Sequence, residues 1–365
     1  MCDEHLVEQV TGHKIDPRAH RDGLNPSEVM VGRTLTLERV LQLNSRQFFY
    51  AMLKDNPELT AIYPGIEDDI LRGAIDCHIH AYPDFVHRSQ DMIDISVAAA
   101  RGGMRAVCFK DHWNLTANVA YVVQRYIDDM VADGRLANRV EVFGGLGLNH
   151  GINPEAVKIA LQYPNCKVIW FPTFKSYGWA RFAGIEDRDG YVRLVGPDQQ
   201  VLPEVREVFE IAAEAGALCS LGHTDFEELL PLCTLANELG VKTLLDHPLL
   251  ELNKLLIVEM QQLADLGTYV GTYCQPMIPS LYQPVCDPYE TVDTIRAVGA
   301  ERCVAGSDFG QVLHVNTVEG MRIFIRALLG FGVPRDDVRK LLVDNPTRLL
   351  GLEPIETLAP VEAQV

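Results

Sequence analysis

The sequence predicts an α/β fold, a (β/α)8 TIM-type barrel with an N-terminal helical extension. Eight apolar runs of strand length follow one another between residues 74 and 308, and segments with helical periodicity separate them. Alternating strands and helices indicate a parallel sheet, and eight strands indicate that the sheet closes into a barrel. An open doubly wound sheet is the alternative, but no predicted strand is followed by a Gly-x-Gly-x-x-Gly turn.

Three segments make up the predicted domain organisation. Residues 1–70 form an N-terminal arm and helical extension, residues 71–352 form the barrel, and residues 353–365 form a C-terminal tail. In the extension, apolar residues recur at helical spacing over residues 36–54, and Asp55-Asn56-Pro57 stops the run. We expect this helix to pack on the barrel.

The barrel elements are predicted from apolar runs and from helical spacing. The strands are expected at Ala74–His80, Ala106–His112, Val140–Leu148, Lys167–Thr173, Ala217–His223, Thr243–His247, Thr268–Tyr273 and Cys303–Asp308. The helical patterns between them include Pro154–Leu161, Pro203–Glu214, Phe226–Leu239 and Leu252–Leu266. The ends of these strands with their following loops would carry the functional residues, as in other barrels of this class.

One connection is unusually long. It runs from Phe174 to Val201, with a hairpin signal at Asp189-Gly190 and a short apolar run at Tyr191–Val195. Loops from strand to helix normally have about 2–6 residues, so an insertion of this size suggests a lid or a substrate wall. A solvated excursion is the alternative.

Charge and composition exclude several classes of partner. The formal net charge is -18 and no cluster of Lys and Arg exists, which argues against nucleic acid. No apolar stretch approaches the ~20 residues that span a bilayer, and the N-terminus does not have the pattern of a signal peptide. The nine cysteines include no Cys-x-x-Cys pair. We therefore expect a cytoplasmic protein with reduced cysteines and a small-molecule substrate, and leave homo-oligomerisation open.

The pair His78 and His80 is the strongest chemical signal. Side chains in a strand alternate, so both imidazoles face the same way with Asp76 below them, as an orienting or a core acid, and can share a metal ion. Buried histidines bonded to backbone carbonyls would look the same. The ligand hypothesis is strengthened because other predicted strands end in residues of ligand type, namely Lys110, His112, His223, His247 and Asp308.

Several segments together resemble the amidohydrolase superfamily of metal-dependent hydrolases and, more narrowly, an uncharacterised amidohydrolase-related family. The matching segments are His78-Ile79-His80-Ala81-Tyr82-Pro83-Asp84, Lys110-Asp111-His112, Gly144-Gly145 with Asn149, Trp170-Phe171-Pro172-Thr173, Gly222-His223, His247-Pro248, Ser307-Asp308-Phe309-Gly310-Gln311, Glu319-Gly320 and Asn345–Leu352. They span residues 74–352, and the first 70 residues fall outside the match.

The resemblance implies a set of site residues. The metal ligands would be His78, His80, Lys110, His223, His247 and Asp308, around two divalent ions of zinc or manganese, with iron as an alternative. The bridging lysine would be a carbamate. It follows the fourth strand in the commonest arrangement, where Lys175 stands, but Lys110 at the end of the second strand fits the narrower family better. An uncarboxylated lysine that polarises substrate is the alternative.

The implied reaction is hydrolysis of a small amide, cyclic amide, lactone or ester by a metal-activated water, with Asp308 as proton shuttle. Catalytic roles are expected for Asp308, His112 and Lys110. Substrate contacts are expected for Asp84, His150, Thr173, Lys175 and Gln311. A metal-dependent oxygenase, decarboxylase or deaminase with the same ligands is an alternative, and so is a barrel that binds metal without catalysis.

Overall fold

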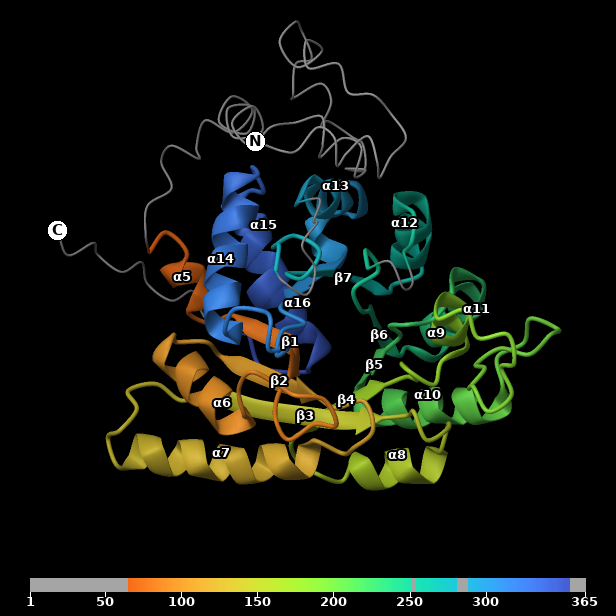
Figure 1. Cartoon of the computed structure of the whole chain (residues 1–365), viewed down its shortest axis with the longest axis horizontal. Coiled ribbons are helices and arrows are strands. Elements are labelled where there is room, and N and C mark those ends of the chain that lie inside the picture. The colour runs from red at the N-terminus through yellow and green to blue at the C-terminus, as the bar shows by residue number, and fades with distance from the viewer. Residues whose placement is uncertain (1–64, 251–253, 281–287, 355–365) are drawn as a thin grey trace, which may run out of the picture.

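The computed structural model describes residues 65–250, 254–280 and 288–354. Its eight parallel strands are arranged in sequence order, and helices surround them (Figure 1). The strands are β1 Ile75–His80, β2 Ala106–Lys110, β3 Glu141–Gly147, β4 Cys166–Trp170, β5 Leu218–Ser220, β6 Lys242–Leu245, β7 Tyr269–Tyr273 and β8 Cys303–Gly306. The predicted TIM-type barrel and its eight strands are confirmed.

Helices follow the strands around the barrel. They are α5 Asp68–Leu71, α6 Met92–Arg101, α7 Ala117–Ala132, α8 Pro154–Ala160, α9 Tyr177–Phe182, α10 Pro203–Ala215, α11 Phe226–Leu239, α12 Ile257–Asp265, α13 Pro288–Val298, α14 Thr317–Gly330, α15 Arg335–Arg339 and α16 Asn345–Leu349, with the short helices η3 Ala300–Arg302 and η4 Lys340–Asp344. The predicted helix over residues 226–239 has its bounds confirmed, and that over 203–214 extends one residue further.

The barrel closes where the segment after β8 meets β1. The backbone N–H of His80 donates to the carbonyl of Phe309 (2.8 Å), and that of Asp308 donates to the carbonyl of His78 (3.0 Å). The Asp76 carboxylate accepts from the N–H groups of His78 (3.2 Å) and Ser307 (3.1 Å), and so ties the two segments further. Closure therefore brings the first and last strands together at their C-terminal ends.

The alternation of side chains between the two faces of the sheet is interrupted within β1. Its pairing register with β2 shifts between Asp76 and Ile79. Ile75 and Cys77 pack in a small buried cluster with Trp170, whereas Ile79 packs in the large cluster with the helices. This irregularity separates Asp76 from the two histidines, and its carboxylate contacts backbone groups.

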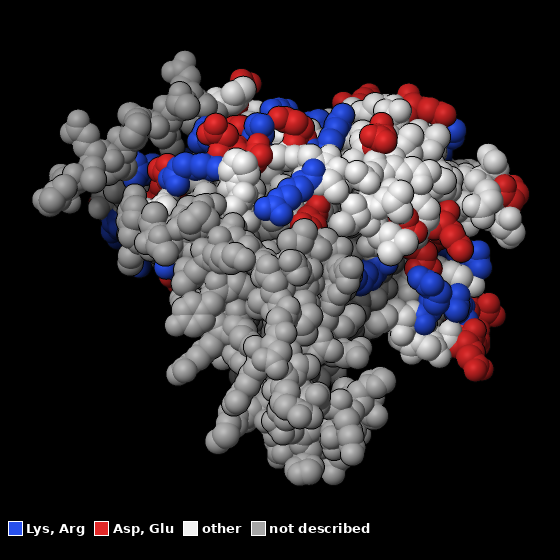
Figure 2. Space-filling model, turned by 90° about the horizontal axis from the view of Figure 1, so that it is seen from above, with Lys and Arg blue, Asp and Glu red and all other residues white. Residues whose placement is uncertain are grey.

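The predicted helix at residues 36–54 and the C-terminal residues from 355 lie outside the described part of the chain, as do residues 252 and 253 of the predicted helix 252–266. None of the described helices is both long and apolar enough to span a bilayer. Acidic and basic side chains are interspersed over the described residues of the face shown in Figure 2.

Candidate metal centre

Three side chains, from the first strand and from the segment after the last strand, converge on one point. Nε2 of His78 lies 3.3 Å from Oδ1 of Asp308, and Nε2 of His80 lies 3.4 Å from the same oxygen. The ligand atoms of these three buried residues all lie within 4.8 Å of one another. Such a group can hold a metal ion. The pairing of β1 with the segment after β8 creates it, because the backbone hydrogen bonds fix both sides of the group.

A second pair of imidazoles adjoins this group. The rings of His223, after β5, and His247, after β6, have centroids 4.9 Å apart, and the His247 ring lies 5.7 Å from that of His78. His223, His247 and Asp308 all have left-handed backbone, with φ of 63°, 33° and 53°. Residues other than glycine rarely adopt this conformation, and it concentrates at functional sites. The three strands thus end in a backbone turn that aims a ligand-type side chain at a common centre.

The histidine rings are neutral and have nitrogens without hydrogen-bond partners, as binding of a divalent ion requires. Nε2 of His78 and Nδ1 of His80, His223 and His247 are buried and have no hydrogen-bond partner among the described residues. Unpaired buried nitrogens are costly unless something binds them. Burial lowers the pKa of His80 and His223 well below the usual range, and that of His247 to about 4. The rings are therefore neutral at neutral pH, which is the form that ligates metals.

Asp246 is a central residue that the sequence reasoning missed. Its Oδ1 lies 3.2 Å from Nδ1 of His78 and accepts the Tyr273 hydroxyl hydrogen bond (2.5 Å). Its Oδ2 accepts the Ser220 hydroxyl and lies 3.9 Å from Nζ of Lys110. Burial opposes ionisation, but His78 and Lys110 hold the pKa of Asp246 well below its usual range. The carboxylate is thus charged, and it links four strand ends.

The two candidate lysines occupy different surroundings. Lys110 is buried at the end of β2, and burial lowers the pKa of its amine. Nζ of Lys175 lies 4.8 Å from the centroid of the Tyr191 ring, in the insertion. Of the two, only Lys110 has a charge that interacts with Asp246 and Asp308.

His112 and Thr173 form part of one hydrogen-bond chain. Nδ1 of His112 is 2.8 Å from the Thr173 hydroxyl, and the His112 ring stacks on that of His80 with centroids 4.8 Å apart. The Asn149 amide donates to the Thr173 hydroxyl (2.7 Å) and to the His112 carbonyl (2.6 Å). Asn149 was part of the matched motif but not of the expected site, and the structure shows that it holds His112 in place.

The remaining predicted substrate residues lie around this centre in different ways. Asp84 is bound by Arg88, with Nε and Oδ2 2.6 Å apart. Gln311 pairs with the Arg88 backbone through an isolated bridge, and its buried Oε1 has no hydrogen-bond partner among the described residues. His150 is exposed and its ring contacts Trp113, with centroids 5.2 Å apart.

The long insertion contacts the metal centre through its first residues. The Ser176 hydroxyl donates to the His223 carbonyl (2.8 Å), and α9 follows directly. The predicted hairpin at Asp189-Gly190 is wrong. Val195 pairs antiparallel with Val201, and Val192 pairs parallel with Ser176. The turn that reverses the chain is therefore the one before Val201, and the strand pairing predicted across Asp189-Gly190 is absent from the described insertion.

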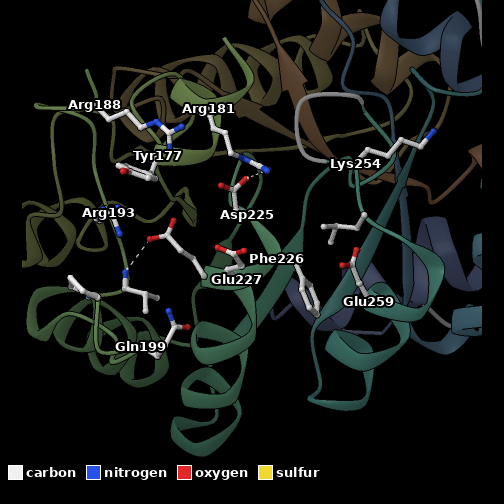
Figure 3. Close-up of a pocket in the computed structure, with 15 residues that line it drawn as sticks. Tyr177, Arg181, Arg188, Arg193, Gln199, Asp225, Phe226, Glu227, Lys254 and Glu259 are labelled. Carbon is white, nitrogen blue, oxygen red and sulfur yellow. Dashed lines mark hydrogen bonds and ion pairs between the residues drawn. The ribbon is translucent and has the colours of Figure 1, made fainter. Parts of the chain in front are cut away.

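On its other side the insertion borders a cavity of about 460 Å³, shown in Figure 3. Its lining carries basic side chains and acidic ones in equal number, namely Arg181, Arg188, Arg193 and Lys254 with Asp225, Glu227, Glu228 and Glu259. Arg181 pairs with Asp225 (2.6 Å), and the guanidinium groups of Arg188 and Arg193 lie 4.7 and 3.9 Å from the centroid of the Tyr177 ring. The cavity therefore has no single sign of charge that would select a ligand.

Comparisons with solved structures agree with the fold. An amidohydrolase from Pseudomonas aeruginosa is 18% identical with a TM-score of 0.54, over 78% of this chain and 97% of that one. The probable dipeptidase PvdM from the same organism is 14% identical with a TM-score of 0.53, over 79% and 98%. A probable 2-pyrone-4,6-dicarboxylic acid hydrolase from Acinetobacter baumannii, with citric acid bound, is 13% identical with a TM-score of 0.50, over 77% and 100%.

These likenesses show the fold, which is the barrel that the sequence resemblance implies. No curated protein matches the sequence. The model of a family of unknown function, DUF6282, matches residues 73–271, which is more than half of the chain. The chain therefore belongs to the DUF6282 family and has the barrel fold of the amidohydrolases.

Proposed function

We propose that this protein is a metal-dependent hydrolase that cleaves a small-molecule amide, cyclic amide, lactone or ester. The observation that carries the proposal is the convergence of His78, His80 and Asp308, whose ligand atoms lie within 4.8 Å of one another. Imidazole nitrogen combined with carboxylate oxygen is typical of catalytic metal sites, whereas structural zinc sites are usually closed by cysteine and histidine.

The chain offers ligands for two ions. His78, His80 and Asp308 would hold one, and His223 with His247 would hold the second beside it. Zinc or manganese is expected, with iron as the alternative, because these ions accept imidazole and carboxylate ligands. When bound, the ions would lower the pKa of a water and polarise the substrate carbonyl.

Lys110 would complete the centre as a carbamate. Its neutral amine would attack CO2, forming an N–C bond and releasing a proton, and the resulting anion would offer two oxygens to the ions. Burial lowers the pKa of the Lys110 amine and favours its neutral form, whereas the Asp246 carboxylate, 3.9 Å away, favours the ammonium. Lys175 lies against Tyr191 instead, so Lys110 is our choice.

Asp308 would move the proton. As general base it would accept a proton from the attacking water, and as general acid it would deliver that proton to the leaving nitrogen or oxygen. Its fixed position 3.3–3.4 Å from both histidines supports this role. His112, held by Thr173 at 2.8 Å and stacked on His80, would orient the substrate carbonyl.

Metal analysis and a substrate screen test the proposal. The protein, purified without added metal, should contain one or two equivalents of zinc, manganese or iron. It should hydrolyse members of a panel of amides, lactones and esters, and lose this activity after chelation. A metal-loaded protein that releases CO2 or consumes dioxygen and hydrolyses none of the panel would contradict hydrolysis. A protein that binds none of these metals would contradict the metal centre itself.

A further inference from the structure

Aromatic rings gather beside the metal centre on loops from different strands. We define the aromatic cluster as Phe85, Trp113, Phe174 and Trp179. Phe85 follows β1, Trp113 follows β2, Phe174 follows β4, and Trp179 lies in α9 of the insertion. The Phe174 ring centroid lies 5.8 Å from that of Phe85 and 5.0 Å from that of Trp179. Three separate connections thus bring their rings to one place.

The cluster touches two histidines of the site. The Phe174 centroid lies 4.5 Å from that of His112 and 6.0 Å from that of His223. The Phe85 ring is also 6.1 Å from His112, and the Trp179 ring is 6.3 Å from His223. A group held by the rings would therefore lie within reach of the metal centre.

Phe85 is the most exposed member of the cluster. It is 58% exposed, although it lies among other rings. The rings next to it meet it nearly at right angles, with interplanar angles of 78° to His112, 84° to Trp113 and 86° to Phe174. Edge-to-face packing of this kind is favourable for aromatic pairs, and the exposed part of the Phe85 ring is open to another flat group. Exposed apolar surface beside a functional site commonly marks a ligand contact.

The four members of the cluster are rings without charge. Burial and the charge of Lys110 lower the pKa of His112 more than Arg88 does, and Nε of Arg88 is 2.6 Å from Oδ2 of Asp84. Arg88 is thus paired with a carboxylate, and the members of the cluster offer their rings to a ligand. An aliphatic group would gain only from burial, whereas an aromatic group would also gain about 2- to 10-fold per ring pair.

We propose that the aromatic cluster binds a flat aromatic group of the substrate, next to the bond that is cleaved. This inference rests on the proposed function for the identity of the bond. The substrate would then be an aromatic amide or ester. Phe85 and Phe174 would be the residues that determine this specificity.

Two amides of matched size test the inference. Benzamide and cyclohexanecarboxamide carry the same polar group, but only the first is flat. Binding of each to the full-length protein, as purified, is measured by calorimetry and by tryptophan fluorescence. Two of the three tryptophans, Trp113 and Trp179, belong to the cluster, and the third, Trp170, is buried in the barrel. Benzamide should bind about 10-fold more tightly than cyclohexanecarboxamide, and should change the fluorescence saturably.

Variants of the cluster residues show which side chains cause the preference for benzamide. Phe85→Ala, at an exposed position that should not disturb folding, should reduce the preference for benzamide to under about threefold. Phe174→Leu keeps an apolar side chain and should do the same. Tyr126→Ala, in an exposed aromatic of α7, is the matched control and should leave the preference unchanged. Trp179→Phe should reduce the fluorescence change, with Trp113 giving the remainder, while calorimetry still detects binding.

Equal affinity for the two amides, no saturable binding of either, or an unchanged preference in both Phe85→Ala and Phe174→Leu would overturn the inference. These measurements need no turnover. A failed hydrolysis screen would therefore contradict the proposed reaction but not the preference for aromatic ligands. A missing preference would contradict the aromatic site but not the proposed reaction.

Discussion

Nδ1 of His78 lies 3.2 Å from Oδ1 of Asp246, while Nε2 of the same ring lies 3.3 Å from Oδ1 of Asp308. The imidazole therefore stands between two carboxylates. A carboxylate behind a ligating histidine fixes the ring orientation and tautomer and raises the basicity of the ligand nitrogen. Asp246 is held in turn by the hydroxyl groups of Tyr273 and Ser220. We infer that Asp246 positions His78.

Asp246→Asn should weaken metal binding by about 10–100-fold, the range for losing a carboxylate behind a ligand. The measurement is a competition titration with a chelator of known affinity. Asp225→Asn is the matched control, because Asp225 lies two residues after His223 but pairs with Arg181 at 2.6 Å. If both variants keep native affinity, Asp246 has no positioning role.

The sequence predicted the order of the strands well, but it placed several strand ends too late. The strands predicted to begin at residues 217, 243 and 303 were expected to end at His223, His247 and Asp308. In the structure β5, β6 and β8 end earlier, at Ser220, Leu245 and Gly306. At those three residues the backbone is left-handed, with φ of 63°, 33° and 53°. Histidine and aspartate adopt this conformation more often than most residues, but an apolar run gives no sign of where such a turn begins.

The same turn explains why Asp246 was missed. In a regular strand, Asp246 and His247 would point to opposite faces, so only one of them could reach the site. The strand ends at Leu245 and His247 has φ of 33°, which brings both side chains to one centre. A charged residue directly after the apolar run Thr243–Leu245 was the signal available. The pair His78 and His80, in contrast, lies within the strand β1, as predicted.

His78→Ala and His223→Ala test the two halves of the ligand set. His223→Ala should lose one metal equivalent, and His78→Ala should lose the other or both, because His78 lies between the two groups of ligands. Both proteins should still fold, since the barrel core does not depend on these rings. Elemental analysis gives the metal content, and circular dichroism checks the fold. Full metal content in both variants would refute the assignment.

Asp308→Asn should keep much of its metal but lose about 10²–10⁴-fold in rate, the range for a missing general acid or base. The amide retains one oxygen as a ligand but cannot accept the proton. Turnover is compared with that of the native protein on a substrate from the screen, at equal metal content. A rate near that of the native protein would remove the proton-shuttle role and leave Asp308 as a ligand only.

Gly310→Ala should destabilise the protein by disturbing the junction of β1 and β8. Gly310 has φ of 135°, and a Cβ there would collide with the His80 carbonyl. We expect a lower free energy of unfolding by about 1–3 kcal/mol beyond the backbone strain itself. Gly151→Ala is the control for that strain, because Gly151 has φ of 113° and no atom lies within 4 Å of an added Cβ. Urea denaturation gives both values, and equal losses would exclude the steric contact.

Lys110→Ala should lose the dinuclear centre, because the carbamate would be the anionic bridge that lets two ions lie about 3.5–4 Å apart. The metal content should fall to one equivalent or less, and bicarbonate should no longer raise it. Lys110 is buried and lies 3.9 Å from Asp246, so the change also removes packing volume beside that carboxylate. Lys110→Met keeps the volume without the amine, and separates loss of the bridge from loss of packing.

Lys175→Ala is the control for Lys110, because the Lys175 amine lies over the Tyr191 ring at 4.8 Å and should leave the metal content unchanged. Carbon-13 spectra of protein incubated with labelled bicarbonate should show a carbamate signal that is absent from Lys110→Met and present in Lys175→Ala. The opposite pattern would move the bridge to the connection after β4. A labelled signal missing from the native protein, with one metal equivalent bound, would leave Lys110 as an uncarboxylated amine paired with Asp246.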